Sequence, residues 1–206
     1  MIQNLILDVG GVLVKWAPAD YAQKAASNAS LSGDDALRLK QALYDHPDWF
    51  KGDQGLLDNK GLYEAARGRL PERLHPALNQ LVFTWMQWLD AMPGADIFVR
   101  RAKKAGLTLY ILSNAGEYFP KSLEKFPFYP LFSGYVVSCE EKVTKPDADI
   151  FNILLDRFHL DASTCFFVDD LAKNVEGAKA VGIDGCLFNG NFDALIKALQ
   201  NRGISI

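Results

Sequence analysis

Short apolar runs recur along the chain, and most of them are separated by segments with a helical spacing of apolar residues. The runs are Leu5–Leu7, Leu107–Leu112, Tyr135–Val137, Cys165–Val168 and Gly185–Phe188. The helical spacing occurs in segments 94–105, 147–158, 172–181 and 191–201. Continuous apolar runs of this length are typical of strands buried on both faces, and their alternation with helices predicts a parallel sheet. We therefore expect an α/β protein with a Rossmann-like, doubly wound parallel sheet.

The segment from residue 17 to residue 92 breaks this alternation, because it contains no convincing strand. Apolar residues with the spacing of one amphipathic helix are Leu74, Leu78, Leu81, Val82, Trp85 and Leu89, and shorter helices are indicated by Leu39 and Leu43 and by Leu62, Ala66 and Leu70. Pro93 and Gly94 then punctuate the chain. We expect an all-helical insert over 17–92 and an α/β core formed by 1–16 and 93–206. An insert at this point would overhang the carboxyl end of the first strand, as a lid does.

Charged and small polar residues follow the predicted strands. Asp8 follows the first strand, Ser113 and Asn114 follow the second, and Asp169 and Asp170 follow the run Cys165–Val168. Lys145 precedes the helix predicted over 147–158. Ligands of open α/β sheets bind at the carboxyl ends of the strands, so these side chains are expected to share one edge of the sheet.

Each of these residues taken singly also has a purely structural interpretation. Asp169 and Asp170 are suited to cap the next helix, Ser113 and Asn114 to form a turn, and Lys145 to be a solvated loop residue. Their common position on one edge argues against these interpretations, because clustered acids repel one another unless a cation neutralises them. Mg²⁺ is the natural candidate for a few carboxylates together with a substrate phosphate.

Composition narrows the classes of partner. The 206 residues carry a formal net charge of −3 and no basic patch, which argues against nucleic acid and anionic membranes as partners. No apolar stretch is long enough to span a bilayer, and no signal peptide is recognisable. Cys139, Cys165 and Cys186 lack C-x-x-C spacing and fit reduced thiols, so a cytoplasmic protein is expected. Whether it is a monomer or a homodimer stays open.

Four segments together resemble the motifs of the haloacid dehalogenase-like (HAD) hydrolase superfamily. They are LILDVGGVLV, LYILSNAG, TKPDADIF and FFVDDLAKNVEGA, which occur in this order within residues 5–177. The predicted insert resembles the C1-type cap of this superfamily in its position. The resemblance implies a phosphomonoester hydrolase that acts on a small phosphorylated metabolite.

The resemblance also implies roles for individual residues. Asp8 would be the nucleophile that forms an aspartyl phosphate, and Lys145 would neutralise charge on Asp8 and on the transferring group. The substrate would contact Ser113, Asn114 and Gly11, and Mg²⁺ would be held by Asp8, Asp170, the Gly10 carbonyl and, directly or through water, Asp169. Asn174 stands where the last motif often has a further residue of the metal shell.

Gly10 departs from the motif, because most phosphatases of the superfamily have an acid there. General acid–base catalysis contributes roughly 10²–10⁴-fold, so its loss needs an explanation. One explanation is an ester with a less basic leaving group: a bacterial alpha-D-glucose-1-phosphate phosphatase subgroup has the same Asp-x-Gly pattern, and it resembles this chain also in the turn Phe50–Leu57. This favours a sugar phosphate as substrate. The alternatives are a non-catalytic binding protein and, less favoured, a 2-haloacid dehalogenase, which needs an arginine for the substrate carboxylate.

The insert offers further candidates. Trp16 follows the first strand closely and is expected to line the pocket, whereas Trp85 and Trp88 are expected to pack between helices. His46 is a candidate replacement for the lost acid. Arginines available to a dehalogenase are Arg38, Arg67, Arg69 and Arg73.

Overall fold

A computed structural model describes residues 2–204 and 206, without the side chain of residue 120. Its sheet contains β1 (Asn4–Leu7), β2 (Thr108–Ser113), β3 (Gly134–Val137), β4 (Cys165–Asp169) and β5 (Asp184–Leu187) in the order β3-β2-β1-β4-β5. All neighbouring strands run parallel. The predicted α/β fold with a doubly wound sheet is confirmed, and each strand lies within one residue of its predicted bounds.

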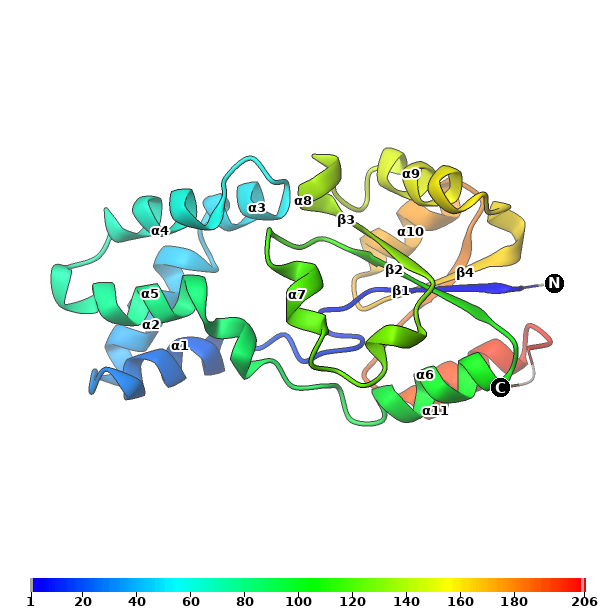
Figure 1. Ribbon diagram of the computed structural model, residues 1–206, viewed down its shortest axis with the longest axis horizontal. Helices are drawn as coiled ribbons and strands as arrows, with labels where there is room; N and C mark the ends of the chain where they lie inside the picture. Colours follow the sequence, from blue (N-terminus) through cyan, green and yellow to red (C-terminus); the bar gives the residue numbers. More distant parts are fainter. Residues whose placement is uncertain (1, 205) are drawn as a thin grey trace.

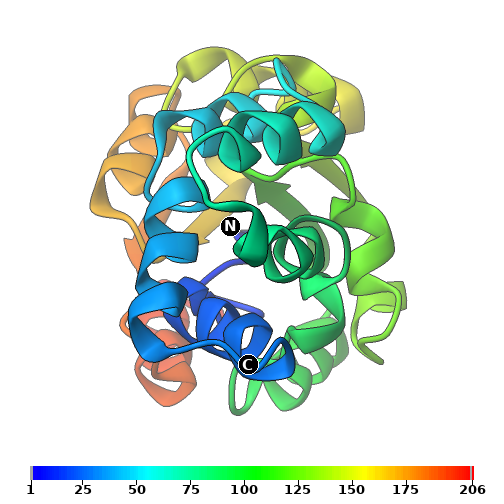
Figure 2. The same ribbon diagram turned by 90° about the vertical axis from the view of Figure 1, so that its left-hand side faces the viewer.

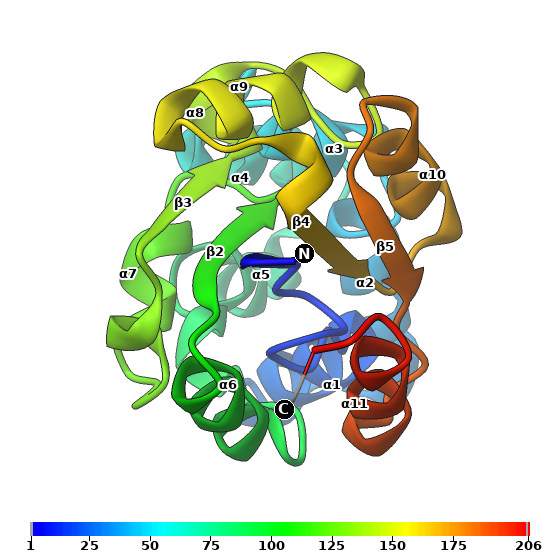
Figure 3. The same cartoon turned by 90° about the vertical axis from the view of Figure 1, so that its right-hand side faces the viewer.

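Helices cover both faces of this sheet (Figure 3). On one face α9 (Ala148–Phe158) and α10 (Ala172–Ala180) pack against Ile6, Leu112 and Phe167. On the other face α6 (Ala95–Lys104) and α11 (Phe192–Gln200) join a larger core that contains Leu5, Leu7 and Ile111. Side chains of a strand alternate between the two faces, so the uninterrupted apolar run of β1 fills both cores at once.

Between β1 and α6 the chain forms a group of helices at the carboxyl ends of the strands (Figure 1). It consists of α1 (Pro18–Asn28), α2 (Gly33–Leu43), α3 (Pro47–Asp53), α4 (Asn59–Arg67), η1 (Glu72–Leu74), α5 (His75–Phe83) and η2 (Trp85–Trp88). We call residues 17–92 the helical segment. Figure 2 looks onto it from its outer side, with the sheet behind. Its division from the core as a domain stays a prediction.

The prediction of a single helix from Leu74 to Leu89 is wrong, because the chain forms η1, α5 and η2 in its place. The break falls at Thr84, whose backbone leaves the helical region (φ −131°) and whose hydroxyl donates to the Gln80 carbonyl at 3.0 Å. A threonine side chain that bonds to the preceding turn competes with helix continuation. The break turns Trp85 away from the line of Leu78 and Leu81, which are fully buried.

Smaller elements complete the core: α7 (Phe119–Leu123), η3 (Tyr129–Leu131), α8 (Ser138–Glu141) and η4 (Ala162–Thr164). The chain leaves the core and returns to it side by side, since Val14 bridges Ala91 and the Lys15 N–H donates to the Asp90 carbonyl at 2.9 Å. In the described part of the chain, no helix has the length and apolar character needed to cross a membrane.

Candidate active site

The strand register brings Asp8 and Asp169 next to each other. Leu7 of β1 pairs with Val168 of β4, and the Asp8 N–H donates to the Val168 carbonyl at 2.9 Å. The strand order reverses between β1 and β4, which is the position where open α/β sheets bind ligands. Asp8 is 7% exposed and Asp169 is fully buried. The two acids therefore form the floor of a site at this edge.

Lys145 lies beneath these acids and is 1% exposed. Its ammonium group is 2.9 Å from Asp8 Oδ1, 2.7 Å from Asp169 Oδ2 and 2.9 Å from the Leu112 carbonyl. These three acceptors use all three of its N–H donors. The interpretation of Lys145 as a solvated loop residue is thus excluded, and its charge is held against the two carboxylates.

The electrostatics of the floor reflect this burial. Burial raises the pKa of Asp8 to about 6, with Lys145 opposing and Asp169 adding to the rise. Burial alone would lower the pKa of Lys145, but the attraction of Asp8 and Asp169 outweighs it and raises the pKa. Lys145 therefore stays a cation at neutral pH, and it favours the ionised, nucleophilic form of Asp8.

Asp169 has little capacity left for a metal ion. Its carboxylate accepts hydrogen bonds from Lys145, from the Leu171 N–H at 2.8 Å and from Asn174 Nδ2 at 3.0 and 3.1 Å. The predicted contact of Asp169 with a metal ion, directly or through water, therefore stays a prediction. Its main work is to position Lys145 and Asn174.

Asp170 points its carboxylate toward the turn after β1, where Gly11 makes room for it. Gly11 has φ +77°, and a Cβ atom there would collide with the Asp170 carboxylate. The Gly11 N–H donates to the Val14 carbonyl at 2.8 Å, and Gly11 is not part of the cavity wall. Gly11 therefore serves the close approach of Asp170, and its expected contact with substrate stays a prediction.

These residues suit a divalent cation. Carboxylate oxygens of Asp8, Asp169 and Asp170 lie within 4.8 Å of one another, and burial raises the pKa of Asp170 with Asp169 adding to it. The Gly10 carbonyl accepts no hydrogen bond from a described residue. The buried amide oxygen of Asn174 likewise has no partner among the described residues. Free oxygen atoms beside close carboxylates are the donor set of a hard cation, so the residues fit Mg²⁺.

Ser113 and Asn114 differ in what they can do. Ser113 is 3% exposed and lines the cavity beside Asp8. The Asn114 side chain is engaged with the backbone of Lys145, accepting from its N–H at 2.8 Å and donating to its carbonyl at 2.9 Å. The Asn114 side chain therefore fixes the loop that carries Lys145, whereas the Ser113 hydroxyl has no hydrogen-bond partner among the described residues. The expected contacts of both residues with substrate stay predictions.

Above the floor lies a cavity of about 490 Å³ between the strand ends and the helical segment. Its most prominent surface, here called the aromatic wall, consists of Trp16, Tyr44, Trp49 and Trp85. The Trp16 ring centroid lies 5.5–5.7 Å from the centroids of the other three rings. Trp16 lines the pocket as predicted. Trp85 packs against the core, as expected, and after the break at Thr84 its side chain also lines the cavity, which the sequence did not predict.

Two further predictions concern groups of the helical segment. His46 caps the start of α3 and accepts from the Asp48 N–H at 3.2 Å, so it is not part of the cavity wall. Asp53, at the end of α3, lines the cavity, although nothing in the sequence beyond its place in the turn Phe50–Leu57 pointed to it. Among the described residues no arginine lines the cavity, and Arg73 is paired with Asp35 at 2.7 Å.

The parallel sheet, with buried acids and a buried lysine where the strand order reverses, defines an α/β protein with a polar site at the carboxyl ends of its strands. A model of the haloacid dehalogenase-like hydrolase family matches residues 2–182, and the chain belongs to this family. It is similar to the sesquiterpene phosphatase astK of Aspergillus oryzae, with 25% identity over 184 residues that cover 87% of this chain and 86% of the relative.

Two solved structures with low sequence identity share the fold. A HAD family enzyme from Bacteroides thetaiotaomicron, bt-2542, in complex with magnesium and inorganic phosphate has 20% identity and a TM-score of 0.69 over 95% of this chain and 99% of that one. L-2-haloacid dehalogenase from Xanthobacter autotrophicus with covalently bound chloropropionic acid has 17% identity and a TM-score of 0.69 over 100% of this chain and 85% of that one. At these identities the likeness extends to the fold alone.

Proposed function

We propose that this protein is a Mg²⁺-dependent phosphomonoester hydrolase that acts through an aspartyl-phosphate intermediate on Asp8. The observation that carries the proposal is the floor of the site. The carboxylate of Asp8, where the strand order reverses, is held against the buried Lys145. Oxygen atoms of the Asp170 carboxylate and the Asn174 amide lie beside it. A nucleophile, a fixed positive charge and a cation site are the parts that phosphoryl transfer requires.

In this proposal Asp8, Asp170 and the Gly10 carbonyl would hold Mg²⁺, with Asp169 and Asn174 acting behind them. When bound, the ion would neutralise the charge of the phosphoryl oxygens. Asp8 attacks the phosphorus atom in line with the ester bond while Lys145 and Ser113 stabilise the developing charge. The bond to the alcohol breaks, and water then hydrolyses the acyl phosphate on Asp8. Residues 17–92 serve as a C1-type cap that screens these steps from bulk solvent.

The alcohol part of the ester is a separate question. The Asp-x-Gly pattern supports a sugar 1-phosphate, because its anomeric oxygen is a less basic leaving group and needs less protonation than a simple alkoxide. The aromatic wall supports a second candidate, an ester of an apolar or aromatic alcohol, because four rings supply large apolar area and few directional hydrogen bonds. The similarity to a sesquiterpene phosphatase favours the same candidate.

The test is a phosphate-release assay with and without Mg²⁺, using sugar 1-phosphates, sugar 6-phosphates, aryl phosphates and a prenyl monophosphate. Turnover that requires both Mg²⁺ and Asp8, with Asp8→Asn as the control, is expected. A preference for sugar 1-phosphates would support the first ester class, and a preference for the prenyl or aryl ester would support the second. Chloride release from 2-chloropropionate without any phosphate release would instead establish a dehalogenase. Absence of both activities, with Mg²⁺ still bound, would establish a binding protein.

A further inference from the structure

The site described so far lacks a group that can protonate the departing alcohol. Acids and other titratable residues that line the cavity are Asp8, Asp45, Asp53, Asp170, Tyr44, Tyr118, Lys145 and Lys173. Asp8 is the proposed nucleophile, Asp170 is a proposed metal ligand, and Lys145 has no N–H to spare. Asp45 is paired with Lys40 at 2.6 Å, and the Tyr44 hydroxyl donates to the Leu81 carbonyl at 3.4 Å. Among the described carboxylic acids of this lining, Asp53 is the one with neither a partner nor a role assigned above.

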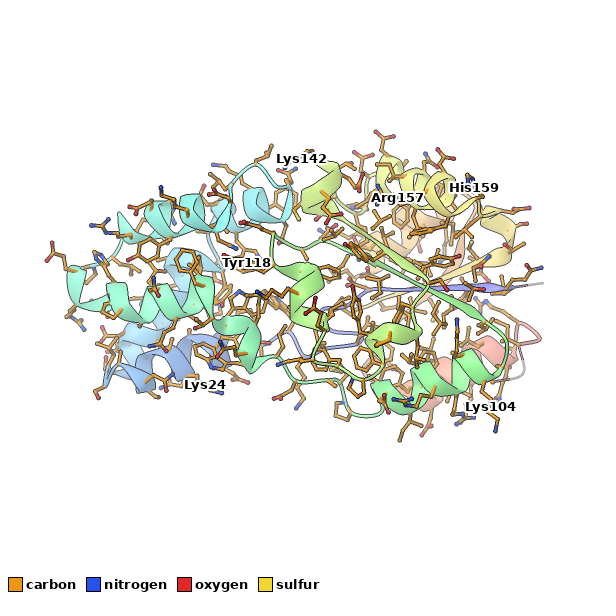
Figure 4. The ribbon with its side chains drawn as sticks, viewed as in Figure 1. Lys24, Lys104, Tyr118, Lys142, Arg157 and His159 are labelled. Atoms are coloured by element: carbon orange, nitrogen blue, oxygen red, sulfur yellow. The ribbon has the colours of Figure 1, made fainter. Side chains whose placement is uncertain are left out.

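Asp53 belongs to the helical segment but is fastened to the core. Its carbonyl accepts a hydrogen bond from Ser138 Oγ, at the start of α8, and Lys142 Nζ donates to the Gly55 carbonyl at 2.6 Å. Gly55 has φ +65° and approaches the Cys139 carbonyl so closely that a Cβ atom has no room. Figure 4 shows Lys142 beside this turn. These contacts hold the end of α3 over the strand ends, so Asp53 keeps a fixed position above the floor.

The carboxyl group of Asp53 is free to exchange a proton. It forms no hydrogen bond or ion pair with any described residue, although it faces the same cavity as Asp8. Burial and, secondarily, the charge of Asp8 raise the pKa of Asp53 to about 7. A carboxyl group with such a pKa is present in both protonation states near neutral pH, which suits an acid in one step and a base in the next.

We propose that Asp53 is the general acid–base of this hydrolase, an inference that rests on the proposed phosphatase function. As Asp8 attacks phosphorus, the ester P–O bond breaks and the Asp53 carboxyl gives its proton to the leaving oxygen. The resulting carboxylate then takes a proton from the water that attacks the phosphorus of the Asp8 acyl phosphate. Inorganic phosphate leaves, and both carboxyl groups return to their starting states.

The position of Gly10 allows an independent check. A Cβ atom built on Gly10 meets nothing nearer than Trp16 Cβ, at 3.7 Å, and its φ is not in the left-handed region. An aspartate is therefore tolerated there, next to the nucleophile. If the function of Asp53 is to supply a proton, the substitution Gly10→Asp provides a second donor and compensates for its loss.

The experiment measures kcat/KM for phosphate esters whose alcohols span a wide range of pKa, from p-nitrophenyl to simple alkyl. This parameter reports the first step, in which the alcohol leaves. In Asp53→Asn we expect a loss of about 10²–10³-fold with alkyl esters and of less than about 10-fold with p-nitrophenyl phosphate, because p-nitrophenolate leaves without a proton. Adding Gly10→Asp to the Asp53→Asn variant is expected to raise kcat/KM with alkyl esters by about 10-fold or more. Circular dichroism confirms that the variants are folded.

Tyr118→Phe is the matched control, since Tyr118 lines the same cavity from the side of α7 (Figure 4) and is expected to leave the leaving-group dependence unchanged. An equal loss for all esters in Asp53→Asn would overturn the proposal, and so would a leaving-group dependence that changes in Tyr118→Phe alone. If the wild-type protein hydrolyses no ester, the proposed function fails and this inference fails with it. Wild-type turnover with an unaltered dependence in Asp53→Asn defeats the inference alone.

Discussion

The two sides of the cavity are built by opposite principles. On the strand side, Asp8, Lys145 and Asp169 are almost fully buried, and nearly every charged atom has a hydrogen-bond partner. On the side of the helical segment, the aromatic wall provides apolar area, and the carboxyl group of Asp53 has no hydrogen-bond or ion-pair partner among the described residues. Buried charges are costly unless they are paired, so the paired charges hold the floor rigid. On the side of the helical segment, here called the wall, Asp53 beside the four rings is free to change its protonation state.

This difference separates two tasks. The floor fixes the reacting groups in one arrangement, which is how electrostatic stabilisation is made available before the reaction starts. The wall determines which alcohol fits and how its departure is assisted. Substitutions in the floor are therefore expected to remove activity with every ester, whereas substitutions in the wall are expected to change activity differently from one ester to another.

The largest effect is expected from Asp8→Asn in the floor. Removing the nucleophile should lower kcat by at least about 10⁴-fold with every phosphate ester, because the aspartyl-phosphate intermediate can then no longer form. Phosphate release in the presence of Mg²⁺ measures this. A variant that retains more than a tenth of wild-type activity would show that another group attacks phosphorus, and the comparison between floor and wall would lose its basis.

Lys145→Met tests the rigidity of the floor. It leaves Asp8 and Asp169 buried without their cation, and breaking a buried pair in this way costs about 3–5 kcal/mol of folding free energy. Urea unfolding measures this cost, and kcat is expected to fall by about 10³-fold. Lys179→Met is the control, because Lys179 forms an exposed pair with Glu176 and such pairs contribute about 0–1 kcal/mol. Equal stability changes for the two variants would contradict the buried network.

The floor is also the part of the site that the sequence predicts well. Asp8, Ser113 and Asp169 directly follow or end apolar runs, and parallel strands bring their carboxyl ends to one edge. The same pattern defines all five strands to within one residue. The pattern does not predict which groups form hydrogen bonds with one another. The bonds between Asn114 and the Lys145 backbone depend on side-chain rotamers, which are set by packing.

The wall was harder to predict for a physical reason. Helical spacing shows which residues share a face of a helix, but it does not show what that face meets. Trp85 fits the spacing of Leu78 and Leu81, yet the hydroxyl of Thr84 ends the helix and places the ring in the cavity. Asp53 carries no local signal, since its position depends on contacts with Ser138 and Lys142, which are distant in the sequence.

Trp16→Ala tests whether the wall selects the ester. Loss of this ring removes apolar contact that contributes about 1–2 kcal/mol, so kcat/KM should fall about 10-fold for an aryl or prenyl phosphate and less than about 3-fold for methyl phosphate. Trp88→Ala is the control, because Trp88 is not part of the cavity wall and packs beneath Lys24. An equal decrease for both esters would mean that Trp16 supports the fold and not the choice of substrate.

The smallest expected effect concerns the stability of the Mg²⁺-free protein, measured in a chelator. The pKa of Asp53 is raised to about 7 from the usual aspartate value of 3.8, so the folded protein holds this proton to higher pH than the unfolded chain. Folding then takes up a proton between about pH 4 and pH 7, so the contribution of Asp53 to stability is fully present below pH 4 and is lost as the pH rises through 7. Asp53→Asn removes this loss, because its amide does not ionise.

The variant should therefore equal the wild type in stability near pH 4 and exceed it by about 1–2 kcal/mol above pH 7, a figure reduced for the water that reaches the cavity. Urea unfolding at several pH values measures the difference, with Asp34→Asn, an exposed acid at the start of α2, as the control expected to show no such rise. A difference for Asp53→Asn that does not grow with pH would show that its carboxyl ionises as it does in the unfolded chain. A gain in stability from a substitution that lowers activity is the behaviour of a functional group that is kept at a cost to the fold.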